Sequence, residues 1–213
     1  MEEKFFEELK EEIQPYFEDA GGHGFDHSER VYNMAIKIAK AEDVDIDVIK
    51  VAALLHDIAR KIESENKEKC HAEEGAKIAE EILEKTDFPK NKIPNVVHCI
   101  KVHRYSKGLK AETKEAEILQ DADKLDALGA IITARVFSFD GKHNIPIYEP
   151  NNPPKNEYIP YGDSSGVNHL YEKVLKIKPE TFKTKKAQEI AGGRSDFVKE
   201  FVERIKKEWI GEL

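Results

Sequence analysis

Four side chains of the types that bind divalent metals are spread over the first 123 residues: His27, the adjacent pair His56 and Asp57, and Asp123. Imidazole nitrogens and carboxylate oxygens together suit Mn, Fe, Co, Ni, Zn or Mg. A carboxylate on an apolar helix face is costly unless it is paired or bound to a cation. The pattern therefore predicts that these four residues hold a divalent metal ion.

Helical periodicity places each of these side chains on an apolar face, because residues three, four and seven apart lie on one side of a helix. The apolar residues that share a face are Val31, Met34 and Ile38 with His27, Ile49, Ala52 and Ala53 with His56, and Ala116, Leu119 and Ala127 with Asp123. One such histidine is more often a hydrogen-bonded core residue than a ligand. The repetition on several inward faces favours a metal site.

Two further histidines repeat the pattern. His71 shares a helical face with Gly75 and Ile78, and His103 shares one with Val96. They could hold a second metal, or bind phosphate when protonated. We predict that they contact the substrate, and a second metal is the alternative.

Three basic residues are candidates for phosphate contacts: Arg30, Lys101 and Lys124. Arg30 lies one turn after the first histidine, so it projects into the same region. Lys124 adjoins Asp123, although neighbouring helix residues diverge and a salt bridge is the other interpretation. We assign Arg30 and Lys124 to catalysis together with Asp57. A free carboxylate oxygen of Asp57 or Asp123 could orient a water molecule.

Composition narrows the class of protein. The 213 residues include 34 Lys and Arg against 42 Asp and Glu, a net charge of −8, which disfavours stable binding to nucleic-acid backbone. A hydrophobic share of 39% is enough for a folded core. Cys70 and Cys99 make no disulfide framework, no apolar stretch approaches the roughly 18 residues of a membrane span, and no signal peptide is evident. We expect a cytoplasmic protein with no membrane contact, and a homo-oligomer is compatible with the sequence.

The apolar spacing is helical nearly throughout, so we expect an all-α fold. The expected helices cover residues 47–62, 70–86, 91–104 and 112–136, after a first helix that ends near Pro15 and a second that follows the glycine turn 21–24, and before a last helix through 197–209. Residues 138–163 are rich in Pro and Tyr and are expected to form a long loop, which could close over a base or sugar.

These residues resemble the H…HD…D signature of the HD superfamily of metal-dependent phosphohydrolases. The resemblance extends to the YedJ/YpgQ-type branch and covers roughly residues 20–210. It is carried by HSERVYNMA at His27, HAEEGAKIA at His71, ILQDADKLDALGAIITARVF (118–137) and NHLYEKVLKI near the C-terminus.

The resemblance implies an all-helical HD fold around a buried divalent metal, with a C-terminal helical extension. It implies a single domain over 1–213, with an HD core at about 20–136 and a loop and helices at 137–213. It implies hydrolysis of a small phosphorylated substrate, in this branch a nucleoside or deoxynucleoside triphosphate or a related phosphoanhydride, with manganese as the favoured metal. In dinuclear branches of the family two more histidines bind a second metal, and His71 and His103 fall where those would be.

One departure limits the transfer of mechanism. Some HD hydrolases, including the guanosine polyphosphate hydrolases, carry acidic residues three and four positions after the HD aspartate. This chain has Arg60 and Lys61 there. The basic pair could attract phosphate, and a solvated helix end is the other interpretation. The alternatives that the sequence leaves open are a dinuclear dinucleotide hydrolase or oxygenase, a cyclic-nucleotide phosphodiesterase, and a non-catalytic nucleotide sensor on the same fold.

Overall fold

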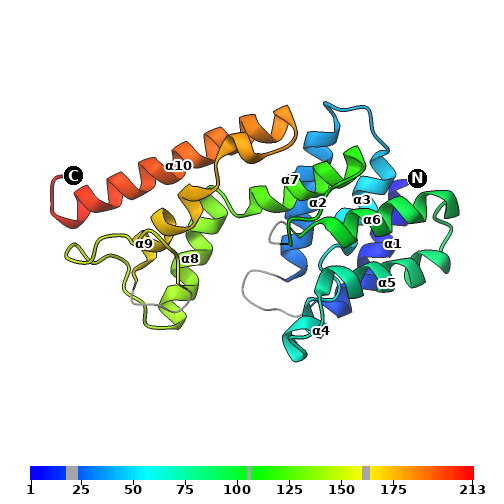
Figure 1. Cartoon of the computed structure of the whole chain (residues 1–213), viewed down its shortest axis with the longest axis horizontal. Helices are drawn as coiled ribbons and strands as arrows, with labels where there is room; N and C mark the ends of the chain where they lie inside the picture. Colours follow the sequence, from blue (N-terminus) through cyan, green and yellow to red (C-terminus); the bar gives the residue numbers. More distant parts are fainter. Residues whose placement is uncertain (18–23, 105–106, 160–163) are drawn as a thin grey trace. The chain divides into compact units, whose positions relative to one another are not determined.

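The structure is a computed structural model that describes residues 1–17, 24–104, 107–159 and 164–213 (Figure 1). Helices make up its regular structure, and no strand occurs in these ranges. The all-α expectation is therefore confirmed. The chain divides into two compact units, Met1–Lys124 and Leu125–Leu213, each of which is described by itself. The single domain expected over 1–213 stays a prediction. No helix in the described ranges is both long and apolar enough to cross a bilayer.

The first unit is built around α3 (Ile46–Leu55), which packs against α2 (Phe25–Ala39) and α6 (Ile93–Val102). Seven of the ten residues of α3 are buried, so it is apolar on nearly every side, as a central helix must be. Asp45 caps its N-terminus by accepting hydrogen bonds from the backbone N–H groups of Asp47 and Val48.

Further elements of this unit also lie in the described ranges. They are α1 (Glu3–Ile13), η1 (Gln14–Tyr16), α4 (Arg60–Glu65), α5 (His71–Glu84), η2 (Lys90–Lys92) and α7 (Lys114–Asp126), whose last two residues belong to the second unit. α5 packs against α6 and α4, and α1 packs against α3.

The prediction of one helix over 47–62 is wrong in one respect, because the helix is interrupted at the His-Asp pair. α3 ends at Leu55, residues 56–59 form a turn, and α4 starts at Arg60. The backbone leaves the helical region at Ala59 (φ −103°, ψ 15°). Adjacent residues of a continuous helix point about 100° apart, whereas this turn directs both side chains of the pair into one cluster.

The helix expected over 112–136 is also divided. α7 ends at Asp126, and α8 (Ala130–Lys142) begins after Gly129, whose φ of +87° is accessible mainly to glycine. α8 then runs to Lys142, so the loop expected from residue 138 begins only after that helix.

The second unit contains α8, α9 (Gly166–Glu172), η4 (Val174–Lys176), η5 (Pro179–Thr181) and α10 (Lys185–Trp209). α10 packs against α8 and α9, and buried Val167, Leu170 and Val198 contribute to its core. Ser165 and Thr184 cap the N-termini of α9 and α10 by accepting backbone hydrogen bonds.

Candidate metal centre

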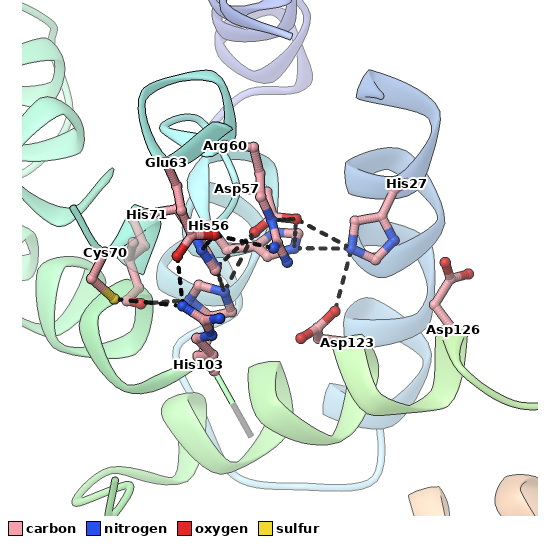
Figure 2. A network of polar contacts seen from close by, with 12 residues as sticks. His27, His56, Asp57, Arg60, Glu63, Cys70, His71, His103, Asp123 and Asp126 are labelled. Atoms are coloured by element: carbon pink, nitrogen blue, oxygen red, sulfur yellow. Dashed lines mark hydrogen bonds and ion pairs between the residues drawn. The ribbon is translucent and has the colours of Figure 1, made fainter. Parts of the chain in front are cut away.

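The four residues that the sequence singles out as metal ligands lie together in the first unit (Figure 2). His27 comes from α2, His56 and Asp57 from the turn after α3, and Asp123 from α7. Both histidines and Asp57 are buried, at 0–2% exposure, whereas the side chain of Asp123 is 22% exposed. The site thus has a closed interior and one wall that faces solvent.

The distances between the donor atoms suit one shared cation. Nε2 of His27 lies 3.3 Å from Nε2 of His56, 3.6 Å from Oδ2 of Asp57 and 3.3 Å from Oδ1 of Asp123. Nε2 of His56 lies 3.7 Å from the same Asp57 oxygen. Two ligands about 2.1 Å from one ion are separated by about 3 Å at octahedral angles and about 3.4 Å at tetrahedral angles. His27, His56 and Asp57 therefore have the spacing of ligands to one divalent ion, and Asp123 lies beside them through its contact with His27.

Asp57 gives an independent reason to expect a cation here. Both of its carboxylate oxygens are buried, and neither accepts a hydrogen bond from the described residues. Nε of Arg60 is 2.8 Å from Oδ2, an ion pair without hydrogen-bond geometry. Burial alone would raise the pKa of Asp57, but the imidazoles of His56 and His103 and the Arg60 guanidinium outweigh it and hold the pKa well below its usual range. A buried, ionised and poorly satisfied carboxylate fits a metal ligand.

His56 is held in the form that binds metals. Its Nδ1–H donates to the carbonyl oxygen of Ala53 at 2.8 Å, so the neutral ring turns the lone pair of Nε2 toward the cluster. Burial lowers the pKa of His56 to about 4, and the ring is therefore neutral near pH 7. Burial would raise the pKa of Asp123, but its hydrogen bond with His27 and the neighbouring imidazoles lower it, which keeps this carboxylate ionised as well.

His71 and His103 lie on the other side of Asp57. Their Nε2 atoms are 3.3 Å apart, and each is 3.5 Å from Oδ1 of Asp57. Nδ1–H of His103 donates to the carbonyl oxygen of Ile100 at 2.6 Å. Asp57 therefore directs one oxygen toward each pair of histidines, and Asp57, His71 and His103 form a second group with the spacing of metal ligands.

Glu63 belongs to this cluster and was missed in the sequence. Its Oε2 lies 2.7 Å from Nδ1 of His71, and its Oε1 lies 2.7 Å from Nη1 of Arg104. Helical-face spacing could not relate Glu63 to the His-Asp pair, because the turn at 56–59 separates them. The available signal was an acidic residue in the short helix that directly follows the pair.

The basic residues expected to contact phosphate are placed as follows. Arg30 forms an ion pair with Asp26 at 2.6 Å, Lys101 is exposed on α6, and Lys124 is buried, at 8% exposure, next to Asp123 in α7. Their roles in phosphate binding stay predictions.

The remaining histidines lie outside the cluster or outside the described ranges. Nε2 of His98 accepts a hydrogen bond from the backbone N–H of Glu112. His143 and His169 are in the second unit, where their rings contact Phe139 and Tyr158. His23 lies in the segment that the structure does not describe.

Comparison with known proteins identifies the family. A family model of the HD domain matches residues 24–128, a span that contains all four candidate ligands. The crystal structure of an HD-superfamily hydrolase from Bacillus thuringiensis is 32% identical and superposes with a TM-score of 0.77, and the match covers 98% of each chain. The chain belongs to the HD superfamily. The predicted HD fold is thereby confirmed, and so is the resemblance stated from the sequence motifs.

Two further relatives of this HD protein are similar over nearly its whole length. A predicted HD superfamily hydrolase from an uncultured Thermotogales bacterium is 32% identical, with a TM-score of 0.70 over 95% of this chain and 92% of the other. YpgQ of Bacillus subtilis is 28% identical over 95% of this chain and 92% of its own length, and it is described as uncharacterized. The crystal structure of YpgQ in complex with ADP matches with a TM-score of 0.71 over 96% of this chain and 95% of YpgQ.

Proposed function

We propose that this HD protein is a metal-dependent phosphohydrolase that acts on nucleotides, with nucleoside or deoxynucleoside triphosphates as the favoured substrates. The observation that carries the proposal is the metal-ligand spacing of His27, His56 and Asp57, with Asp123 3.3 Å from His27. Neither oxygen of Asp57 accepts a hydrogen bond from the described residues. The ADP complex of YpgQ supports a nucleotide ligand in this branch of the family.

In this proposal, His27, His56, Asp57 and Asp123 hold one divalent ion, for which manganese is the favoured candidate. When bound, such an ion lowers the pKa of a coordinated water and polarises a phosphoryl oxygen. The chain itself supplies the orientation. Nδ1–H of His56 is fixed on a backbone carbonyl, and a free oxygen of Asp57 or Asp123 is available to accept a proton from an attacking water.

The substrate would lie against residues of the same cluster. His71 and His103 line the side of Asp57 opposite His27, and we assign them to the substrate-binding wall. Arg30, Lys101 and Lys124 remain our candidates for phosphate contacts, with Arg30 and Lys124 also proposed to stabilise charge during the reaction. The guanidinium of Arg60 joins them because it lies beside Asp57 and the side chain is 32% exposed.

A second candidate function has an observation of its own. Asp57, His71 and His103 are spaced like metal ligands, which favours a dinuclear centre and with it a dinucleotide hydrolase or an oxygenase. Metal analysis separates the two candidates. One ion per chain supports the mononuclear phosphohydrolase, and two ions per chain support the dinuclear centre. Oxygen consumption by an iron-loaded sample would then identify an oxygenase.

The decisive experiment is a screen for release of phosphate and pyrophosphate from a panel of nucleotides, cyclic nucleotides included, with Mn²⁺, Mg²⁺, Co²⁺ and Ni²⁺ supplied in turn. We expect metal-dependent release that is lost in Asp57→Ala, with circular dichroism unchanged. Asp43→Ala is the matched control, because Asp43 is an exposed acid of the same unit. Full activity in Asp57→Ala would refute the proposal, and tight nucleotide binding without any turnover would identify a sensor instead.

A further inference from the structure

Glu63 makes two short contacts that point in different directions from one carboxylate (Figure 2). Oε2 accepts a hydrogen bond from His71, and Oε1 accepts one from Arg104, each at 2.7 Å. A second cation lies near, because Nη1 of Arg60 is 3.7 Å from Oε2. The side chain is 19% exposed, so these partners hold it in a largely enclosed position.

The contact with His71 determines which nitrogen of that ring carries the proton. An ionised carboxylate can only accept hydrogen bonds, so Nδ1 of His71 must be the protonated nitrogen. In the neutral ring Nε2 then has a lone pair. This is the atom that lies 3.5 Å from Oδ1 of Asp57 and 3.3 Å from Nε2 of His103. A flipped ring would place a carbon against Glu63 and lose the hydrogen bond.

The contact with Arg104 fixes the carboxylate in turn. A charge-assisted hydrogen bond of this length is roughly twice as strong as a neutral one. It uses the oxygen that does not contact His71, so the two interactions do not compete. Glu63 is thereby anchored on the C-terminal side of α6 while it reaches His71 at the start of α5.

We propose that Glu63 is a positioning residue, which holds the His71 ring with Nδ1–H turned outward and Nε2 turned toward Asp57. The proposal rests on the function proposed above in one respect only, that His71 works at the same centre. It applies whether Nε2 of His71 meets a substrate or a second cation. It also accounts for a carboxylate beside the centre in a chain that has Arg60 and Lys61 where some HD hydrolases have acids.

The test is the protonation pattern of the His71 ring, read by long-range ¹H–¹⁵N correlation spectra of the full-length protein loaded with Mg²⁺. The His71 signals are assigned through their absence in His71→Gln. We expect a single tautomer with the proton on Nδ1 in the wild type. Glu63→Ala should give a mixture of tautomers, and Glu63→Gln should lose the single tautomer as well, because its one amide oxygen cannot accept from both His71 and Arg104. Glu65→Ala, at an exposed acid of the same helix, is the matched control.

Activity gives a second readout on the same proteins. Loss of an outer partner of this kind costs roughly 10- to 100-fold in metal affinity or activity. We expect kcat/KM to fall by that factor in Glu63→Ala and to stay unchanged in the control Glu65→Ala. A proton on Nε2 in the wild type, or an unchanged tautomer in Glu63→Ala, would overturn the proposal. If Glu63→Ala does not fold, the spectra of the wild type and of Glu63→Gln decide.

The two proposals can fail separately. Spectra report on His71 without any turnover. A protein that shows the expected tautomers but hydrolyses no nucleotide would refute the proposed function and leave the role of Glu63 intact. A metal-dependent hydrolase with His71 protonated on Nε2 would do the reverse.

Discussion

Two titratable side chains in the second unit should make opposite contributions to the pH dependence of stability. Asp140 and His169 line one cavity of about 20 Å³. Asp140 is 3% exposed, and its Oδ2 accepts no hydrogen bond from the described residues. Burial raises the pKa of Asp140 to about 6, and burial together with the Lys173 cation lowers the pKa of His169 to about 4. Each shift favours the neutral form of the side chain in the folded protein.

The sign of each effect follows from which state binds more protons. The pKa of Asp140 is raised on folding, so its contribution is present at low pH and is lost as the pH rises toward 6. The pKa of His169 is lowered on folding, so the unfolded chain binds more protons, and stability is lost as the pH falls from 6.5 toward 4. Each of these pKa changes corresponds to about 3 kcal/mol of unfolding free energy, of which about 2 kcal/mol falls between about pH 4.5 and 7.5. In the wild type the two slopes largely cancel.

Single substitutions should reveal how each group changes the unfolding free energy with pH. Between about pH 4.5 and 7.5, the unfolding free energy of Asp140→Asn should change by about 2 kcal/mol more in the stabilising direction than that of the wild type. The unfolding free energy of His169→Gln should change by a similar amount in the destabilising direction. Urea unfolding followed by the fluorescence of Trp209 measures this, because the sole tryptophan lies in α10 of the same unit. A difference between Asp140→Asn and the wild type that is the same at both pH values would refute the reasoning.

Three further predictions concern the core, a turn and the metal. Ile49→Ala should lower the unfolding free energy by about 2–5 kcal/mol, because Ile49 is fully buried on α3, and thermal unfolding would show no change in midpoint if the helix were peripheral. Gly129→Ala should cost about 1 kcal/mol or more by urea unfolding, since φ is +87° and a Cβ would lie 3.0 Å from the Arg194 side chain; an unchanged midpoint would contradict this. The affinity for Mn²⁺, measured by calorimetry, should fall as the pH is lowered, because imidazole ligands must be neutral. Proton competition at His56 should become strong only near pH 4. An affinity that does not vary with pH would argue against histidine ligands.

The sequence predicted the all-helical class and the proximity of the four candidate ligands, but not where two of the expected helices are divided. Periodicity works for these residues because a helix face has to be apolar where it packs. His27 and Val31 are both buried in α2, as their spacing predicts. Ile49 in α3 and His56 in the turn after it are buried too. The family motif added what periodicity cannot give, which is that side chains from α2, from the turn after α3 and from α7 meet.

The breaks in the helices could not be predicted from spacing. The turn after Leu55 interrupts a run of helix-forming residues, and its effect is tertiary: it directs His56 and Asp57 into one cluster. Gly129 was visible in the sequence, but a glycine within a helical pattern is often tolerated, and only the backbone shows its left-handed conformation. The position of Glu63 depends on the first of these breaks, so helical spacing alone could not place it beside the His-Asp pair.

The central claim is that His27, His56, Asp57 and Asp123 share one divalent ion. An anomalous difference map measured at the manganese absorption edge, from crystals of the full-length protein grown with Mn²⁺, tests it most directly. The account predicts a peak within about 2.0–2.3 Å of Nε2 of both histidines and of an oxygen of each aspartate. Fully ordered side chains at these four positions with no manganese peak among them would contradict it.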